Sequence, residues 1–543
     1  MRILLLALAA TAAIAGPVRA QQADVDVLRY RFYLTLPDTG KLVRAAATTI
    51  FHRDSANESI SLDLLAPMAV RAVYLGCSAA RATPFTHDGR VVRVPLGEGG
   101  DSADSTCVTV QYEGEPADGL VISTDSAGRW RAFGDNWPNR ARHWLPTVDH
   151  PSDKAYVEFI VDAPAALTVV ANGTRRGVAP IEPSEGGERR RTAWATVEPI
   201  PTYLMVIAAA PLTETPLGET ACGYAALQRC VTQSVFTAPE QAGFMPGNFT
   251  RAGDIVQFFA RTVGPYPYEQ LLHLQSSTRF GGMENAGAIF YADRLFRRQD
   301  GVSVGLIAHE SAHQWFGNAV TEREWGHLWL SEGFATYFAA LYTRHAFGDS
   351  AFRAEMASIR QAILRAPAVA ERPVLDTAQT DLMGLLNANS YQKGGFVLHM
   401  LRTEVGDSAF FRAIRAYYQA HVHKTALTDD LREAMERETG RDLTWFFDQW
   451  LRRPGFPELT LKWEHDRATG SLAVVVTQGE RFAPFRIPLR VEVVDVSGRQ
   501  THLVIDVPEQ RTARITVPGR WVEPPFAIRP DPLVEMLGEF RTP

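Results

Sequence analysis

The chain has 543 residues, of which 46% are hydrophobic and 21% are charged, and its formal net charge is −6 at pH 7. This size and composition predict several domains with ample hydrophobic cores. The negative charge argues against nucleic acid or an anionic membrane as a partner. After the first twenty residues, no stretch is long and apolar enough to span a bilayer.

Residues 1–20 have the features of a secretory signal peptide. A basic start is followed by an apolar stretch from Ile3 to Ala15 and by Val18-Arg19-Ala20, a cleavage site of the small-x-small type. The alternative, an N-terminal membrane anchor, is disfavoured because the apolar stretch is too short. We therefore expect an exported protein, periplasmic or secreted, that is cleaved at about Ala20.

Residues 21–215 predict an antiparallel β-domain. Short runs of alternating polar and apolar residues, such as VLRYRFYLTL and YVEFIVDA, are separated by turns rich in Gly, Pro and Asp. Pro211 and Pro216 mark the end of this pattern.

Residues 216–455 predict a mainly helical domain that carries the most informative motif. The segment SVGLIAHESAHQWFGN, residues 303–318, contains no proline, begins with a potential capping serine and ends in Gly-Asn. Within it, His309 and His313 lie one helical turn apart on one face. This spacing lets both imidazoles bind one Zn²⁺ and leaves Glu310 beside the metal as a base.

A third candidate ligand, Glu332, follows nineteen residues after His313. It lies near the start of a second predicted helix, about residues 326–347, which is apolar nearly all round. A lone buried carboxylate must be paired, protonated or metal-bound. A salt-bridged core glutamate is the alternative, but the upstream motif favours a metal ligand. We therefore expect one Zn²⁺ per chain.

Residues 456–543 predict a small β-sandwich domain and a tail. Pro454-Gly455-Phe456-Pro457 ends the last long predicted helix, and alternating runs such as SLAVVVTQ and THLVIDV follow. The whole chain is thus predicted to be a multidomain α+β protein.

The four cysteines fit an exported protein. An even number of cysteines in such a chain suggests two disulfides, most simply Cys77–Cys107 and Cys222–Cys230. Two other pairings, and free buried thiols, remain open. No cysteine has a spacing typical of zinc sites, so the metal ligands are His and Glu alone.

Three motifs in order resemble one family. They are the His309–His313 motif with Glu332, the upstream loop Gly281-Gly282-Met283-Glu284-Asn285-Ala286-Gly287-Ala288, and the downstream Tyr391-Gln392-Lys393-Gly394. Together they resemble the zinc metallo-aminopeptidases, the gluzincin family of aminopeptidase N and the leukotriene-hydrolase-like aminopeptidases. The resemblance runs from roughly residue 25 to 460 and implies a catalytic domain like that of thermolysin.

The resemblance implies a role for each motif residue. Glu310 takes a proton from the attacking water and later delivers it to the leaving amine, and the Tyr391 hydroxyl stabilises the oxyanion. The glycines of the loop let its backbone approach the substrate. Glu284, flanked by Met283 and Asn285, offers a carboxylate to the free α-ammonium group of a peptide. The expected activity is removal of N-terminal residues from peptides.

Two departures from the family pattern change these expectations. Many relatives place a second Glu or Gln before an Arg-x-x-x-Pro-x-x-Asp segment to share the amine, whereas this chain has Asn136 and Trp137 there. Asn136 is therefore only a weak candidate for amine binding. Longer members carry a large helical domain after the sandwich, and the chain ends at Pro543, so we expect that domain to be absent.

Other activities remain as alternatives to an aminopeptidase. They are an endopeptidase, a zinc hydrolase of a non-peptide substrate, and a catalytically silent relative that binds peptides. Glu284 argues against the first, and the complete set of ligands and base argues against the last. The sequence does not specify an oligomeric state.

Overall fold

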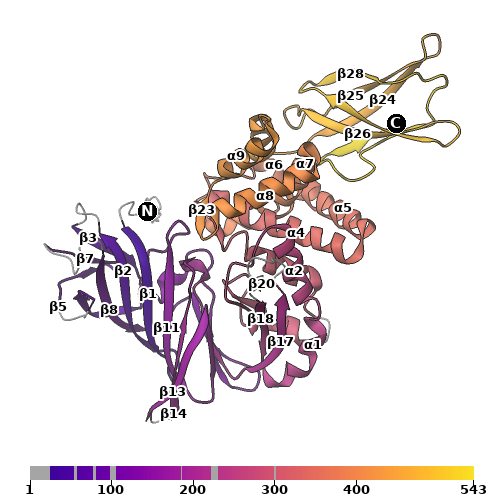
Figure 1. The fold of residues 1–543 in the computed structure, drawn as a ribbon. Helices are drawn as coiled ribbons and strands as arrows, with labels where there is room; N and C mark the ends of the chain where they lie inside the picture. Colours follow the sequence, from indigo (N-terminus) through magenta and orange to yellow (C-terminus); the bar gives the residue numbers. More distant parts are fainter. Residues whose placement is uncertain are drawn as a thin grey trace, which may run out of the picture.

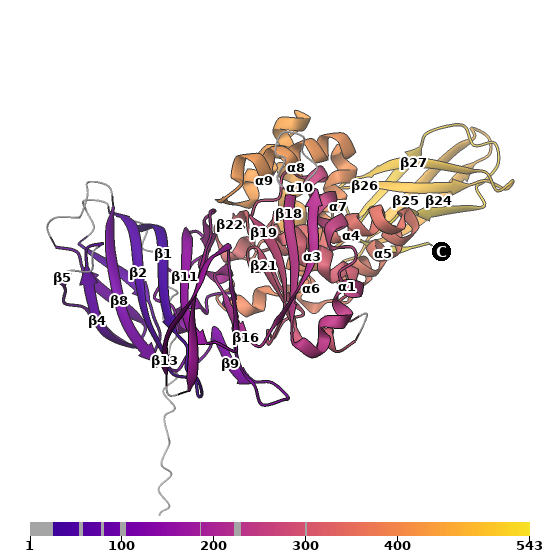
Figure 2. The ribbon, with the colours of Figure 1, turned by 60° about the horizontal axis from the view of Figure 1, so that its bottom comes forward.

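The structure is a computed structural model that describes residues 25–53, 58–77, 81–97, 105–184, 186–221, 230–298 and 301–542. Three regions follow one another in space as they do in the sequence. N-terminal strands lie at one end, helices occupy the middle, and C-terminal strands project from the far side of the helices (Figure 1). A second view shows the same order (Figure 2).

The N-terminal region is built on a nine-stranded sheet with the order β13-β14-β11-β1-β2-β8-β4-β5, and β15 pairs with β11. Strand β1 is antiparallel to β2 but parallel to β11, so the sheet is mixed and the prediction of an antiparallel domain needs correction. Alternating hydrophobicity sets which face a strand buries but carries no information about strand direction. The strands are β1 (Val25–Thr35), β2 (Val43–Arg53), β4 (Ala69–Leu75), β5 (Arg81–Ala82), β8 (Thr106–Gly114), β11 (Lys154–Pro164), β13 (Thr174–Ser184), β14 (Gly187–Ala195) and β15 (Ile200–Pro201).

Two smaller sheets complete this region, a four-stranded one with the order β12-β16-β10-β9 and a three-stranded one with the order β3-β7-β6. Asn136 and Trp137, which the sequence analysis singled out, follow two and three residues after the end of β10 at Gly134. The strands are β3 (Ser59–Asp63), β6 (Thr86–His87), β7 (Val91–Pro95), β9 (Leu120–Thr124), β10 (Trp130–Gly134), β12 (Thr168–Ala171) and β16 (Ile207–Ala210).

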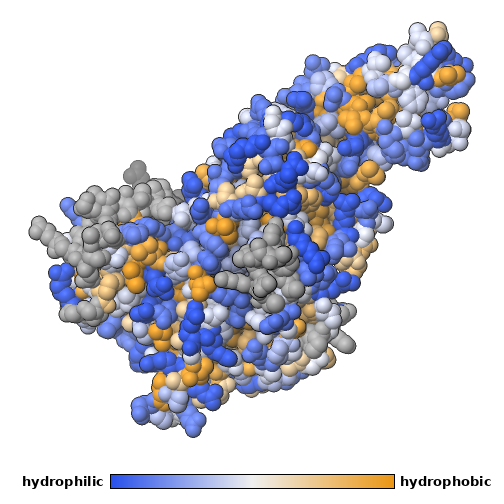
Figure 3. Space-filling view, in the orientation of Figure 1, coloured by the Kyte–Doolittle hydropathy of each residue, from blue (hydrophilic) through white to orange (hydrophobic). Residues whose placement is uncertain are grey.

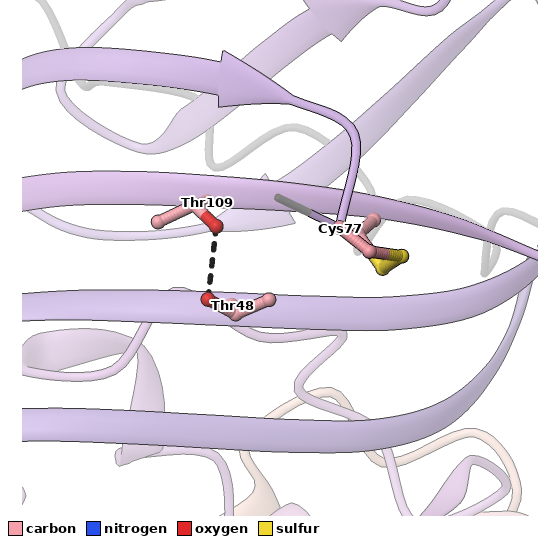
Figure 4. Close-up of a disulfide and its surroundings, with 4 residues drawn as sticks. Thr48, Cys77 and Thr109 are labelled. Carbon is pink, nitrogen blue, oxygen red and sulfur yellow. Dashed lines mark hydrogen bonds between the residues drawn. A yellow bond between two sulfur atoms is a disulfide. The ribbon is translucent and has the colours of Figure 1, made fainter. Parts of the chain in front are cut away.

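Cys77 and Cys107 form a disulfide at the edge of the large sheet, with their Cα atoms 4.8 Å apart. Figure 4 shows the bond next to the cross-strand pair Thr48 and Thr109, whose hydroxyls are 2.9 Å apart. The disulfide joins the turn after β4 to β8, so it fixes two strands that are already neighbours in the sheet.

The middle region begins with a five-stranded sheet that the sequence analysis did not predict. Its order is β17-β18-β19-β21-β20, and the predicted boundary at residues 215 and 216 lies inside β17. Strands β18, β19 and β21 run parallel, and β21 is buried throughout. Such strands lack the polar alternation that marks a half-exposed strand. The strands are β17 (Thr213–Ala221), β18 (Cys230–Thr237), β19 (Gln270–Ser276), β20 (Gly282–Met283) and β21 (Ala288–Ala292).

Helices follow this sheet and hold the predicted motifs. Helix α4 is buried nearly all round, as its composition predicts. The helices are α1 (Met245–Asn248), α2 (Ala252–Thr262), α3 (Val304–His313), α4 (Trp329–Phe347), α5 (Asp349–Arg365), α6 (Pro367–Glu371), α7 (Gly394–Val405), α8 (Asp407–His421), α9 (Thr428–Thr439) and α10 (Thr444–Leu451), with the short strands β22 (Val320–Glu322) and β23 (Lys424–Ala426) between them.

Helix α3 is shorter than predicted. Its cap is as expected, because the Ser303 hydroxyl accepts a hydrogen bond from the Leu306 N–H at 3.1 Å. The helix ends at His313 rather than near Asn318. Gly317 has φ +113°, and a Cβ there would lie 2.3 Å from the Ser331 hydroxyl. The chain therefore turns early to bring α4 against α3.

The C-terminal strands form two sheets, with the orders β28-β25-β24-β30 and β27-β26-β29. Their inner residues join the hydrophobic core of the helices. Figure 3 shows hydrophobic side chains gathered on the face of this region that is turned to the viewer. The strands are β24 (Glu458–Asp466), β25 (Ser471–Gln478), β26 (Ile487–Val494), β27 (Gln500–Val507), β28 (Thr512–Val517), β29 (Ala527–Pro530) and β30 (Glu539–Arg541).

Two predictions lie outside the described residues, the signal peptide at residues 1–20 and the Cys222–Cys230 disulfide. In the part of the chain that the structure describes, no helix has the length and apolar character needed to cross a membrane.

Candidate active site

The two histidines of α3 converge on one point with Glu332 of α4. The Nε2 atoms of His309 and His313 are 3.1 Å apart, and each is 3.3 Å from Oε2 of Glu332. Tetrahedral zinc with ligand bonds of about 2.0–2.1 Å places its ligand atoms about 3.3 Å apart. The three atoms therefore form a triangle of the size that one zinc ion requires.

The burial of Glu332 supports the same conclusion. Its side chain is only 6% exposed, and among the described residues Oε2 has no hydrogen-bond partner apart from its contacts with the two histidine nitrogens. Leaving a buried carboxylate oxygen unpaired is costly unless a cation compensates. The residues present thus fit a zinc ion, and they form one of two groups in the described chain that could hold a metal.

The second group consists of Glu284, Glu310 and His313, whose ligand atoms lie within 4.8 Å of one another. It shares His313 with the first group and brings two further carboxylates to the site. Burial raises the pKa of Glu310 well above its usual range, and the charges of Glu284 and Glu332 add to this. The site is therefore rich in buried acidic groups, which favours a bound dication.

The same charges also act on His313. Burial lowers its pKa, but the carboxylates of Glu284 and Glu332 outweigh burial and raise the pKa to about 10. For Glu332, burial raises the pKa, and the charge of His313 outweighs this and lowers it to about 2. Both shifts reflect the strong attraction of the acidic cluster for positive charge.

Contacts behind the metal ligands fix their orientation. Nδ1 of His313 lies 3.2 Å from the carbonyl oxygen of Phe316 and 3.0 Å from the hydroxyl of Ser331. A proton on Nδ1 that bonds this carbonyl leaves Nε2 free to bind a metal. The sequence analysis missed Ser331, although it lies directly before Glu332 and is buried.

Gly282 must lack a side chain because the side chain of Glu310 occupies the space beside it, and not only because a substrate has to approach. A Cβ at Gly282 would lie 2.2 Å from Oε1 of Glu310. By contrast, no atom lies within 4 Å of a Cβ built on Gly281. Of the two glycines predicted to admit substrate, one therefore makes room for the candidate base.

Two polar residues after the zinc motif hold the loop that carries Glu284. The side chains of Gln314 and Asn318 both donate hydrogen bonds to the carbonyl oxygen of Glu284, at 3.0 and 2.5 Å. Gln314 also accepts a hydrogen bond from the Gly287 N–H at 2.9 Å. These two residues were not predicted to act at the site, and their polar character in a segment that is otherwise apolar was the available signal.

The predicted loop residues divide into those that line a cavity and one that does not. A cavity of about 450 Å³ is lined by His309, His313 and Glu332, which we call the metal group, and by Glu310, Tyr391 and the loop from Gly281 to Glu284. Asn285 is fully buried outside that lining. Both atoms of its side-chain amide lack a partner among the described residues.

Tyr391 reaches the metal group from a short π-helical segment, Asn389–Lys393. Its ring stacks on His309 with the centroids 6.0 Å apart. Its hydroxyl lies within hydrogen-bonding reach of Glu332, and burial, with this carboxylate, raises the pKa of the phenol well above its usual value. The hydroxyl therefore stays protonated and can donate a hydrogen bond at the centre of the site.

Asn136 does not face the cavity with a free amide. Its Nδ2 donates to the carbonyl oxygen of Met205 at 2.5 Å, and its Oδ1 accepts from the indole of Trp144 at 2.8 Å. The neighbouring Trp137 lines the cavity instead. The N-terminal region thus supplies an aromatic wall at this position.

The chain matches two profiles of one family. The profile described as peptidase family M1 domain matches residues 250–450, and the profile described as peptidase M1 N-terminal domain matches residues 46–204. Together these two segments cover most strands of the N-terminal sheets and nearly all of the helices, α2 to α10.

Curated relatives and solved structures agree with this match. The chain is 25% identical over 387 residues to "Probable aminopeptidase 2" of Sulfurisphaera tokodaii, which is 67% of this chain and 46% of the relative. It is 30% identical over 349 residues to aminopeptidase N of Streptomyces lividans, which is 60% of this chain and 38% of the relative. This chain therefore spans less than half the length of these relatives.

Two solved structures share the fold. The M1 zinc metallopeptidase from Deinococcus radiodurans superposes with a TM-score of 0.68 at 25% identity, over 80% of this chain and 95% of that one. The aminopeptidase A of Legionella pneumophila, solved in complex with aspartic acid, superposes with a TM-score of 0.80 at 17% identity. That match covers 95% of this chain and 60% of the other.

Proposed function

Because this chain belongs to the peptidase M1 family, we propose that it is a zinc-dependent aminopeptidase that removes residues one at a time from the free N-terminus of peptides. The observation that carries the proposal is the proximity of Glu284 to the candidate base. Carboxylate oxygens of Glu284 and Glu310 lie within 4.8 Å of each other and of His313. An α-ammonium group bound by Glu284 leaves room for only one residue before the bond that is cleaved.

The residues of this chain divide the chemistry among them. Bound zinc, held by His309, His313 and Glu332, would polarise the scissile carbonyl and acidify water. Glu310 accepts the proton of the attacking water and passes it to the departing amine.

Tyr391 and Glu284 bind two parts of the substrate, the oxygen of the scissile carbonyl and the α-ammonium group. The Tyr391 hydroxyl donates a hydrogen bond to the oxygen that gains negative charge. Glu284 holds the substrate ammonium by a charge-assisted contact in a buried position, and Gln314 and Asn318 fix the backbone that carries it. Trp137 supplies an apolar surface for the first side chain.

The test is hydrolysis of one peptide series by the zinc-loaded protein, each peptide with a free and with an N-acetylated end. We expect single residues to be released from free peptides only. Equal cleavage of acetylated peptides would identify an endopeptidase. Failure to cleave either form despite bound zinc would favour a non-peptide hydrolase or a peptide-binding protein.

We further propose that the protein is exported after removal of residues 1–20. The basic start and the Val18-Arg19-Ala20 site support this, and so does the Cys77–Cys107 disulfide, since such bonds persist in oxidising compartments. The N-terminal sequence of the protein purified from a periplasmic fraction should begin at about Gln21. An intact Met1 in the mature protein would contradict the proposal.

A further inference from the structure

The cavity has two walls of different origin. On one side lie Trp137, Phe280 and Leu386, which pack with the hydrophobic core of the N-terminal region. On the other side lie Leu306 and Ile359, which pack with the core of the helices. The metal group lies between them. Because Glu284 and Phe280 belong to the same loop, the first wall is the one that holds the amino end of a peptide.

The second wall, with Leu306 and Ile359, therefore faces the residues of the peptide that follow the cleaved bond. On α4 the residues Glu332, Thr336 and Ala339 line the cavity at helical spacing. Helix α5 returns antiparallel along α4 and contributes Ile359 and Glu355, one turn apart. The cavity thus extends from the metal group along the α4–α5 pair.

Glu355 is the charged residue at the far end of this wall. It is half-buried, and its carboxylate accepts a hydrogen bond from Thr343. In the part of the chain that the structure describes, no ion pair within 4 Å involves Glu355, and none of the residues that line the cavity is a lysine or an arginine. A half-buried carboxylate without a cationic partner favours a ligand that supplies the charge.

The length of the wall indicates which part of a peptide lies there. Ala339 is seven residues beyond Glu332 on α4, which is about 10 Å along the helix at 1.5 Å per residue. An extended peptide advances about 3.3 Å per residue, and the four-carbon stem of lysine extends its reach further. The carboxylate therefore faces residues that follow the cleaved bond by two or three positions.

We propose that Glu355 is a specificity-determining residue that selects peptides with a cationic side chain at the second or third position after the cleaved bond. This inference rests on the proposed aminopeptidase function. The cleft around Glu355 already carries the acidic groups Glu284, Glu310 and Glu332. Of these four carboxylates, only Glu355 falls outside both groups of described residues whose ligand atoms lie within 4.8 Å of one another, so its charge acts on substrate choice and not on the chemistry.

The test uses peptides that differ in one residue. A common first residue is followed by alanines, and lysine, glutamine or glutamate replaces one alanine at the first, second or third position after the cleaved bond. Release of the first residue gives kcat/KM for each peptide. The lysine-to-glutamate ratio is then compared within one protein variant, so that differences in folding or zinc loading cancel.

In the unaltered protein we expect a ratio of about three to ten at the second or third position, which decreases at high salt. Glu355→Gln should bring the ratio close to one, and Glu355→Lys should reverse it. The matched control is Glu433→Gln on α9, an exposed glutamate that pairs with Arg437. It should retain the original ratio.

A second readout does not require catalysis. In chelator-treated protein, the Kd of dye-labelled peptides should show the same preference for lysine and the same loss of preference in Glu355→Gln. Cleavage and binding without a charge preference, or a preference unchanged in Glu355→Gln, would overturn the role of Glu355 and leave the aminopeptidase function intact. Failure to cleave any peptide would instead overturn the aminopeptidase function, and the binding preference would then decide the role of Glu355.

Discussion

Two buried polar residues beside the cavity, Asn136 of the N-terminal region and Glu332 of the helical region, differ in the partners that the protein gives them. Beside the cleft, the N-terminal Asn136 has both ends of its amide occupied by protein partners. In the helical region, Glu332 keeps an oxygen without a partner, and both oxygens of the buried Glu322 also lack one among the described residues. Buried polar groups that are hydrogen-bonded within the protein hold a fold together. Buried polar groups at a cavity that lack such partners are available to a metal or a substrate.

This contrast separates effects on stability from effects on activity. Substitutions of cavity residues in the helical region should reduce catalysis while the protein remains folded. Substitution of a hydrogen-bonded polar residue such as Asn136 should destabilise the protein while the remaining folded molecules stay active.

The largest effect is expected for Glu310→Gln, which removes the candidate proton acceptor and keeps its size. We expect kcat to fall by about 10²–10⁴, with zinc content and Tm nearly unchanged because the buried carboxylate is replaced by a neutral amide. Metal analysis and thermal unfolding check the second half of the prediction. Near-normal activity would rule out Glu310 as the base.

Tyr391→Phe should have the next largest effect. It removes one hydroxyl that donates to the developing negative charge and keeps the ring stacked on His309. We expect kcat to fall by about 10²–10³ with little change in KM. An increase in KM alone would assign Tyr391 to substrate binding.

Glu284→Gln should weaken the binding of the free amine. Losing a charge-assisted contact in a buried site should lower kcat/KM by about 10–100-fold, mainly through KM. Because Glu284 also adds to the negative charge around His313, zinc content is measured in parallel. If kcat/KM is unchanged at full zinc occupancy, the amine is bound elsewhere.

Asn136→Ala tests the other side of the comparison. It leaves the carbonyl oxygen of Met205 and the indole of Trp144 unpaired in a buried position, which should cost about 2 kcal/mol of stability. Activity per folded molecule should stay within about twofold. Gln500→Ala in β27, an exposed position, is the matched control. Loss of activity without loss of Tm would place Asn136 in the site.

The motif residues were accessible to sequence analysis because their chemistry depends on local spacing. His309 and His313 lie one turn apart in any helix, and Ser303 caps that helix as its sequence predicts. The five-stranded sheet was not accessible in this way. Its inner strands are buried on both faces, and a short apolar run does not distinguish a strand from part of a helix.

Residues that act through contacts between distant segments also escaped prediction. Gln314 and Asn318 hold the backbone of Glu284, about thirty residues earlier in the chain. Gly282 is needed because Glu310 occupies the space beside it. Neither contact leaves a repeating pattern in the sequence, because both form only when the loop packs against α3.

The sequence by itself indicated the family and predicted the candidate ligands and the candidate base, because a metal site imposes residue types and spacings along one helix and the start of another. Tertiary structure decided which polar side chains have partners within the protein and which remain available to a ligand. It occupied the amide of Asn136, placed Trp137 in the cavity wall and left Glu355 without a cationic partner among the described residues. These outcomes depend on which neighbours a side chain meets after packing, and that information belongs to the fold as a whole.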